Sequence, residues 1–366
     1  MILGSASRGE DYERVRTYRR AGPQRVLSGA GSSAKIVRAI EQLGACRPLL
    51  ATGPTLGRSD LRDQVEQTLG DRGVGTFADC SQHAPSTAVH ALSAVITETE
   101  ADLVVALGGS SVSDCVKLAL WTLSLQGAHD PLPYVAVPTT LSAGEFTGGA
   151  GYIDPRDGTK RTITDPRLVA SCVILDPWMT VLTPDRLWTS TAMKAVEHAV
   201  EALWSRYAHP VVDAQAMQAL RILGGNLDAS RDVDAWEARA ACQIAAWMSI
   251  AGVSTGGLRL SHVIGHQAGA RWGIQHGITS AVLLPTVMRF LAPKTLSEQA
   301  RVAAALGVDV AGRPSEQVAV SAARAVEELA ESVDLPTRLG ETDAIADEID
   351  LVARSSVSAA TALGLT

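Results

Sequence analysis

The sequence is poor in cysteine, in long apolar runs and in clustered positive charge. Its five cysteines are widely spaced without a CxxC pair, and no basic-then-apolar leader is present at the start. We therefore expect a protein of the reducing cytoplasm that has no disulfides. No apolar stretch reaches the roughly 20 residues that a membrane span requires. The chain is therefore not expected to cross a membrane.

The distribution of charge excludes one class of partner. The formal net charge of −7 is spread along the sequence, and no stripe of Lys and Arg is interleaved with aromatic residues. We therefore do not expect nucleic acid as a partner. A small-molecule substrate is expected, and an anionic one would need a local basic pocket. Apolar residues make up 46% of the chain and charged residues 19%, which is ordinary for a globular enzyme.

The length of 366 residues exceeds what one compact core usually holds, so two domains are expected. From Arg25 onward, short apolar runs alternate with amphipathic stretches, which predicts an α/β order with a mainly parallel sheet. The first apolar run is Val26 to Leu27, and the strand candidates are Pro48 to Thr52, Leu103 to Leu107, Tyr134 to Val137 and Cys172 to Leu175.

After residue 180 the pattern becomes almost entirely helical. We therefore predict an α/β domain at 21–180 and an all-helical domain at 181–366. Residues 1–20 are predicted to form an arm ahead of the fold, either a mobile tail or a segment that packs on a partner subunit. Segments with helical apolar spacing are Arg186 to Arg206, Pro210 to Leu223, Asp234 to Gly252, Gly257 to Ala270 and Gly277 to Leu291.

A glycine-rich turn follows the strand candidate Leu103 to Leu107 and indicates phosphate binding. It reads GGSSVSDCVK, from Gly108 to Lys117. Backbone N–H groups of such a turn can approach a pyrophosphate, and the N-terminus of the next helix adds partial positive charge. Thr139 and Thr140 follow the next strand and offer hydroxyl donors to the same ligand. A strand-to-helix turn without a ligand would show the same local pattern.

A histidine cluster marks the helical half. Three of the eight histidines, His262, His266 and His276, occur within fifteen residues, and the first two are one helical turn apart. In an earlier helix, Lys194 and His198 share one face. A lone histidine in such a helix is more often a packed or surface residue than a ligand. The clustering and the spacing together predict a site.

These motifs resemble the iron-containing alcohol dehydrogenase superfamily, in the family's order. GGSSVSDCVK looks like its GGGSxxDxxK turn and VPTTLSAGEFT like its PTTxGTGSE segment, and KRTITDP and LDP follow where expected. The resemblance implies a dehydroquinate synthase-like fold, in which the α/β domain at 21–180 is the dinucleotide-binding domain and the helical domain at 181–366 is the catalytic domain. It also implies a homodimer or other homo-oligomer, and NADP or NAD as cofactor. The cofactor-binding residues that it implies are Gly53, Gly108, Gly109, Ser110, Ser111, Asp114, Thr139, Thr140 and Lys160.

Two positions depart from the family's cofactor motifs. The third motif glycine is Ser110, which adds a side chain where backbone and pyrophosphate usually approach closely. Gly53 ends the strand candidate where NAD-preferring members resemble LIVTD and use the Asp on the adenosine ribose. Without that carboxylate the 2'-phosphate of NADP is not repelled, so we predict a preference for NADPH or little discrimination against it.

The segment SHVIGHQAGARWGIQHG is similar to the family's HxxxHxxGxxxxxxHG signature. By this resemblance His198, His262 and His276 correspond to metal ligands, and His266 corresponds to a histidine that helps in proton relay near the nicotinamide. The fourth ligand does not match, because the family's DAxxHAxE is KAVEHAVE here, with Lys194 in place of the Asp. An ammonium repels a divalent cation where a carboxylate attracts it. No metal is therefore expected.

The change at Lys194 makes the chain resemble maleylacetate reductases, a branch that also lacks this Asp and works without a required metal. We therefore predict an NAD(P)H-dependent reductase of a maleylacetate-like or other oxo or unsaturated acid. Lys194 would stabilise developing negative charge, and His266 would be the general acid. The remaining predicted catalytic residues line the pocket and are His198, His262 and His276.

Three alternatives are open. The first is a metal-dependent alcohol dehydrogenase in which the three ligand-like histidines and water hold Fe or Zn. The second is a non-redox lyase or cyclase on the same fold, for which Ser110 and Lys194 are the motivating departures. The third is a non-enzymatic binding protein. Lys194 can also turn away and lie at the surface, because its side chain is long.

Overall fold

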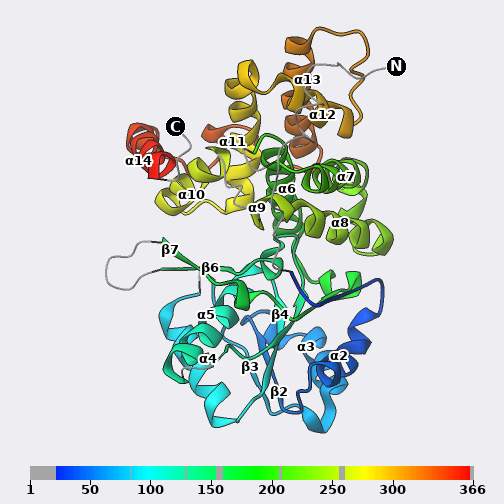
Figure 1. Cartoon of the computed structure of the whole chain (residues 1–366), viewed down its shortest axis with the longest axis vertical. Helices are drawn as coiled ribbons and strands as arrows, with labels where there is room; N and C mark the ends of the chain where they lie inside the picture. The colour runs from blue at the N-terminus through cyan, green and yellow to red at the C-terminus, as the bar shows by residue number, and fades with distance from the viewer. Residues whose placement is uncertain are drawn as a thin grey trace.

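The computed structural model describes residues 22–82, 84–127, 130–153, 160–205, 208–254 and 260–362. Figure 1 shows a half with a central sheet, formed by the first part of the chain, beside a half built of helices. The change falls between Leu175, which ends the last strand, and Asp185, which begins the first long helix of the second half. No helix in the described ranges is long and apolar enough to cross a membrane. The predicted arm at 1–20 lies outside the described residues.

A six-stranded sheet forms the centre of the first half, in the order β1-β8-β5-β4-β2-β3. All neighbouring strands pair in parallel. The four strands in the middle of the sheet are buried along their whole length, as expected when helices cover both faces. The predicted α/β order is confirmed. The strands are β1 (Arg25–Ser28), β2 (Pro48–Thr52), β3 (Gly75–Phe77), β4 (Leu103–Gly108), β5 (Tyr134–Pro138) and β8 (Cys172–Leu175).

The apolar pattern of the strands places helices on both faces of the sheet. Val104 and Ala106 of β4 belong to the core under α4 (Ser86–Glu98) and α5 (Ser110–Gly127). Their neighbour Val105 points the other way, into the core under α2 (Ile36–Gln42) and α3 (Asp60–Leu69). Successive side chains of a strand alternate between faces. A continuous apolar strand can therefore serve two cores at once.

A two-stranded antiparallel hairpin, β6 (Gly149–Ile153) and β7 (Lys160–Thr164), lies outside the main sheet and was not among the predicted strands. The buried Lys117 of α5 fixes the loop that precedes this hairpin. Its Nζ donates to the carbonyl oxygens of Gly144 at 2.6 Å, Thr147 at 2.8 Å and Gly149 at 2.9 Å. These three bonds use every donor of the ammonium.

The LDP segment joins the last strand to the first. The buried carboxylate of Asp176 accepts hydrogen bonds from the backbone N–H groups of Gly31 at 3.1 Å, Ser33 at 2.9 Å and Trp178 at 3.0 Å. Asp176 therefore holds the turn after β1 against the end of β8, which is its role in this fold.

The second half is helical, as predicted. The predicted segment from Asp234 to Gly252 is divided into two helices, because the helix ends at Ser249 and a second begins at Ala251. Part of the predicted segment that begins at Gly257 lies outside the described residues. The helices are α6 (Asp185–Leu203), α7 (Pro210–Asn226), α8 (Trp236–Ser249), α9 (Ala251–Ser254), α10 (Leu260–Trp272), α11 (His276–Leu291), α12 (Leu296–Ala305), α13 (Ser315–Glu331) and α14 (Ile349–Ala362).

Helix α6 is the centre of this half and is surrounded by α7, α8, α9 and α11 (Figure 1). Its residues from Ala192 to Leu203 are all buried, including the charged ones. Short 3-10 helices fill the connections, at η1 (Ser32–Lys35), η2 (Leu56–Arg58), η3 (Gly70–Arg72), η4 (Gly144–Phe146), η5 (Pro166–Leu168), η6 (Pro177–Thr180), η7 (Ala229–Arg231), η8 (Ala292–Lys294), η9 (Leu339–Glu341) and η10 (Ala346–Glu348).

Candidate functional site

A cleft opens where the strands of the sheet end. Gly53 follows β2, Gly108 ends β4 and Thr139 follows β5, and these strands are neighbours in the sheet. Ligands of open α/β sheets bind at the carboxyl ends of the strands. The cleft has a volume of about 310 Å³, and its other wall is formed by Leu182, Thr183, Pro184 and residues of α6 as far as Thr191. The cleft therefore lies between the two halves of the chain.

The structure brings most of the predicted cofactor residues to this cleft. Asp114 does not line it, because it lies further along α5 near Lys117. The side chain of Lys160 lies outside what the structure describes. The predicted residues that line the cleft are Gly53, Gly108, Gly109, Ser110, Ser111, Thr139 and Thr140.

The glycines of the turn are required by close packing. Gly108 has φ +153°, and a Cβ there would lie 2.5 Å from Cγ2 of Val112. A Cβ on Gly109 would lie 2.9 Å from Cγ2 of Thr140. Ser110 begins α5 directly after this turn, and Ser110 and Ser111 both line the cleft. A glycine turn that leads into the N-terminus of a helix is the arrangement found in anion-binding loops.

The cleft has no charged side chain in the part of its wall that the structure describes. Gly53 leaves the end of β2 without a carboxylate, and Thr55 and Gln82 are the polar neighbours there. Binding of a dinucleotide at this cleft therefore depends on N–H groups, hydroxyls and the partial charge of the α5 N-terminus.

Hydrogen bonds connect the two walls of the cleft. The hydroxyl of Thr183, in the segment that joins the halves, donates to the carbonyl oxygen of Thr139 at 2.7 Å. The N–H of Leu141 donates to the hydroxyl of Thr191 in α6 at 3.1 Å. The loop after β5 is thereby fixed to the helix that carries Lys194.

Lys194 points into the protein and not to solvent. The residue is only 9% exposed, and its Nζ lies 2.5 Å from Oε2 of Glu197 and 2.9 Å from Nδ1 of His262. Thr191, three residues earlier on α6, is on the wall of the cleft. Residues three apart lie on the same side of a helix. Lys194 therefore lies one turn deeper than the cleft, on the same side of α6.

Glu197 is the counter-ion of Lys194. Its carboxylate is fully buried and also accepts hydrogen bonds from the hydroxyls of Ser261 at 2.5 Å and Ser280 at 2.9 Å. Hydrogen bonds from one ammonium and two hydroxyls hold this carboxylate in a single orientation. Because these groups come from α6, α10 and α11, Glu197 joins the three helices that build the site.

Glu201, one turn further along α6, caps the helix that carries the histidines. One of its carboxylate oxygens accepts hydrogen bonds from the backbone N–H groups of Ser261 at 2.9 Å and His262 at 3.4 Å. Burial raises the pKa of Glu201 well above its usual value, and the charge of Glu197 raises it further, while Lys194 opposes both. Glu201 therefore has a positioning role at the start of α10.

The four predicted histidines form a row of adjacent rings. The ring centroids of His198 and His262 lie 5.7 Å apart, those of His262 and His266 4.5 Å apart, and those of His266 and His276 4.6 Å apart. His198 and His262 are buried, whereas His266 and His276 are half-buried. The row therefore runs from the interior of α6 toward the surface.

The inner histidines are neutral. Burial lowers the pKa of His198 and of His262 well below the usual histidine value, and the positive charge of Lys194 lowers both further. When charged Lys194 donates to Nδ1 of His262, the proton of that neutral ring must be on Nε2. His262 is thereby fixed as a hydrogen-bond donor through Nε2.

This arrangement does not fit a divalent metal ion. A metal ligand needs a free nitrogen lone pair, but in His262 Nε2 carries the proton and the lone pair of Nδ1 accepts from Lys194. No group in the described ranges lies within hydrogen-bonding distance of Nδ1 of His198, whereas metal-binding histidines are usually oriented by such a partner. Among the residues that the structure describes, no three His, Cys, Asp or Glu side chains are grouped to hold a metal.

Gly277, the glycine of the HG pair, allows α11 to pack directly against α6. A Cβ at this position would lie 2.0 Å from the carbonyl oxygen of Ser190 in α6. The N-terminal turn of α11, which begins with His276, therefore contacts the backbone of α6 directly. A Cβ on Gly265 of α10 would similarly lie 2.9 Å from Oγ1 of Thr279 in α11.

Sequence reasoning missed Glu197 and its hydroxyl partners. The spacing of Lys194 and Glu197, three residues apart in the KAVEHAVE segment, was a usable signal for an ion pair along the helix. Ser261 and Ser280 gave no local signal, since each is an ordinary helix residue whose partner is distant in the sequence. The ion pair is specified by three helices together.

Comparisons with known proteins agree with this geometry. A model of iron-containing alcohol dehydrogenases matches residues 23–177, and a model of the C-terminal part of the Fe-containing alcohol dehydrogenase family matches residues 188–364. Maleylacetate reductase 2 of Cupriavidus pinatubonensis is 34% identical over 290 residues, which cover 78% of this chain and 77% of the relative.

Two further proteins are similar over nearly the whole chain. The NAD-dependent methanol dehydrogenase of Bacillus methanolicus is 29% identical over 91% of this chain and 92% of its own length. The crystal structure of maleylacetate reductase from Agrobacterium tumefaciens superposes with a TM-score of 0.80 at 26% identity, covering 94% of this chain and 92% of that one. The chain belongs to the iron-containing alcohol dehydrogenase family and is an NAD(P)-dependent oxidoreductase.

Proposed function

We propose that this protein is a metal-independent reductase that uses NAD(P)H to reduce a maleylacetate-like or other oxo or unsaturated acid. The observation that carries the proposal is the buried Lys194, held by Glu197 at 2.5 Å and His262 at 2.9 Å. It places a fixed positive charge where metal-dependent relatives are expected to have a carboxylate ligand.

A buried ammonium next to the cleft suits a reaction in which negative charge develops on oxygen. Hydride addition to a carbonyl gives an alkoxide, and addition to a conjugated alkene gives an enolate. A preorganised positive group in a site that excludes water stabilises such charge strongly. Because Glu197 and His262 hold Lys194 before substrate enters, little reorganisation is needed during the reaction.

The proton is supplied by His266 in this proposal. The ring of His266 lies between those of His262 and half-buried His276, with centroid distances of 4.5 Å and 4.6 Å. His262 is neutral and next to Lys194, so it stays in place as a donor. His276 lies on the outer side of the row, where it can take up a proton from water and pass it to His266.

The reaction balances with these groups. Bound NAD(P)H supplies a hydride from C4 of its nicotinamide. The substrate carbon accepts the hydride, the π pair of the C=O or C=C–C=O group moves to oxygen beside Lys194, and His266 donates the proton. Proton return from solvent through His276 would restore His266, and exchange of the oxidised nucleotide for NAD(P)H would complete the cycle. The residues of the chain bind the substrate, place a positive group beside its oxygen and move a proton.

The proposed substrate class rests on the donors of the site and on the relatives. Lys194, although paired with Glu197, and the N–H donors of the inner histidines can bind a carboxylate of the substrate. Maleylacetate reductases are repeatedly found among the relatives, at 34% identity in Cupriavidus pinatubonensis and 29% in Burkholderia cepacia. Family membership favours redox chemistry over a lyase, a cyclase or a simple binding protein.

A metal-dependent alcohol dehydrogenase is the second candidate, because the methanol dehydrogenase relative is similar over 91% of the chain. Elemental analysis and two substrate assays separate the candidates. The proposal expects no stoichiometric Fe or Zn, oxidation of NAD(P)H with maleylacetate, and the same rate after chelator treatment. A full complement of metal, or turnover of simple alcohols that chelators abolish, would return the protein to the metal-dependent group.

Substitution of Lys194 tests the central residue. Lys194→Ala should remove most activity without any change in metal content. Lys194→Asp places a negative charge beside three histidines and should raise the affinity for divalent metal while weakening reduction of an anionic substrate. Full activity of metal-free Lys194→Ala would make Lys194 a bystander and leave the mechanism without its electrophile.

A further inference from the structure

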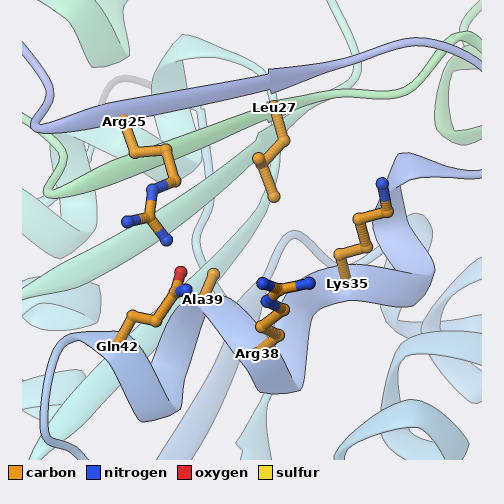
Figure 2. A pocket seen from close by; sticks show the side chains of 6 residues that line it. All are labelled: Arg25, Leu27, Lys35, Arg38, Ala39 and Gln42. Atoms are coloured by element: carbon orange, nitrogen blue, oxygen red, sulfur yellow. The ribbon is translucent and has the colours of Figure 1, made fainter.

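A second concave site lies at the edge of the sheet, between β1 and α2. It has a volume of about 320 Å³, and we name it the β1–α2 pocket. Figure 2 shows side chains that descend from the strand and others that rise from the helix toward the same space. The pocket is lined by Arg25, Leu27, Lys35, Arg38, Ala39 and Gln42.

The sequence brings these side chains together by simple periodicity. Arg25 and Leu27 are two apart in a strand, so both face α2. On the helical side the lining positions are 35, 38, 39 and 42, the spacing of one helix face. Leu27 and Ala39 form an apolar floor, because both belong to or pack on the core beneath α2. The polar ends surround this floor.

The pocket concentrates positive charge without neutralising it. Arg25, Lys35 and Arg38 are all exposed, and in the part of the chain that the structure describes none of them forms an ion pair. Arg72, close by, does pair with Glu41 at 2.7 Å. Three cations in one concavity repel one another, and a bound anion removes that repulsion. This contrasts with a chain whose net charge is −7.

This pocket is separate from the nucleotide cleft. The two share no lining residue. Arg25 begins β1, and an adjoining hollow extends to Ser171 and Cys172 at the start of β8. The cleft is formed where strands end. In a parallel sheet the strands begin on one side and end on the opposite side. A ligand in the β1–α2 pocket therefore does not reach the nucleotide cleft.

We propose that the β1–α2 pocket binds a small, multiply charged oxyanion that carries phosphate or carboxylate groups. The guanidinium groups of Arg25 and Arg38 can each bind two oxygens of such a group, which is the geometry that arginine favours. Lys35 adds a point charge. In Figure 2 the amide of Gln42 lies beside the guanidinium of Arg25, where it can donate to the same ligand.

Calorimetric titration tests the site with two probes, pyrophosphate and citrate, against sodium chloride at matched ionic strength. The nucleotide cleft is another place for pyrophosphate, so the titrations are repeated with saturating NADP⁺. Binding at the β1–α2 pocket should persist under these conditions. Stronger binding of pyrophosphate identifies a phosphate ligand, and stronger binding of citrate identifies a polycarboxylate.

The variant Arg25→Gln/Arg38→Gln should bind the preferred probe at least about tenfold more weakly, because both guanidinium groups are removed. The matched control Lys294→Gln/Arg354→Gln removes the same charge from two exposed residues of the helical half and should bind like the unaltered protein. Unfolding temperatures show that both variants are folded. Absence of binding by both probes, or equal affinity in Arg25→Gln/Arg38→Gln, overturns the proposal.

Discussion

Glu197→Gln is the sharpest test of the charged pair in the site, because it changes one charge and almost no volume. If the amide oxygen takes the place of Oε2, it still accepts from Lys194 and Ser280, and the amide NH₂ faces the hydroxyl of Ser261. The bonds from Lys194 and Ser280 then persist, and the bond with Ser261 reverses its direction, with the amide donating to the hydroxyl. What is lost is the negative charge 2.5 Å from the ammonium.

The size of the effect follows from the burial of the pair. The side chains of Lys194 and Glu197 are 11% and 1% exposed, so water does not replace the lost carboxylate. Removal of one member of a buried pair typically costs roughly 3 to 5 kcal/mol, and we expect about 3 kcal/mol because the hydrogen bonds remain. Loss of one preorganised electrostatic group typically lowers kcat by about a hundredfold or more.

The assay is kcat and KM for reduction of the anionic substrate, together with the unfolding temperature. Glu197→Gln should lose about a hundredfold in kcat, because the ammonium of Lys194 loses its counter-charge. The double variant Lys194→Met/Glu197→Leu should be more stable than Glu197→Gln, since no uncompensated charge stays buried, but equally inactive. Exposed Glu316→Gln is the matched control and should change neither quantity.

The reasoning is refuted if folded Glu197→Gln keeps kcat within about twofold of the unaltered enzyme. The charge on Lys194 would then not contribute to the reaction. It is also refuted if the double variant retains activity, because the site would then work without any fixed positive charge.

Three further predictions concern the cofactor, the proton donor and pH. NADPH should have a kcat/KM at least equal to that of NADH, and Gly53→Asp should shift the ratio toward NADH by about tenfold to a hundredfold; a strong NADH preference before substitution contradicts this. His266→Ala should lower turnover by about a hundredfold with an unchanged unfolding temperature, and normal turnover would assign the acid elsewhere. Burial raises the pKa of Glu145 from 4.5 to about 7, against the opposing effects of its backbone hydrogen bond and Lys117. The stability that protonated Glu145 contributes is therefore full below pH 4.5 and lost as the pH rises through about 7. Across that window the free energy of unfolding of Glu145→Gln, measured in urea, should rise by on the order of 3 kcal/mol relative to that of the unaltered protein.

The fold was predictable because its signals are local. The four buried strands in the middle of the sheet are continuous apolar runs, and each is followed by a turn residue such as Gly53 or Gly108. The edge strand β3 has only three residues, too few to show a period. The hairpin of β6 and β7 was missed because Gly149–Ile153 is rich in glycine and its partner Lys160–Thr164 is polar at all positions but one, so that neither shows an apolar period.

The candidate site was only partly predictable. The row of histidines follows from helical spacing and from the family signature, and the structure brings the predicted rings together. The role of Glu197 could not be derived in full, because its partners Ser261 and Ser280 are more than sixty residues away. Burial of Lys117 was equally hidden, since its three acceptors are backbone carbonyl groups that carry no sequence signal.

The contact at Gly277 has a consequence for how this enzyme tolerates change. The site depends on one position that contributes no functional group, since any side chain there would collide with the carbonyl oxygen of Ser190. Substitution would leave Lys194 and His276 chemically intact but move apart the helices that carry them. A saturation library scored for activity should therefore find position 277 as intolerant as the proposed catalytic residues. Loss of function there would come from displaced geometry alone.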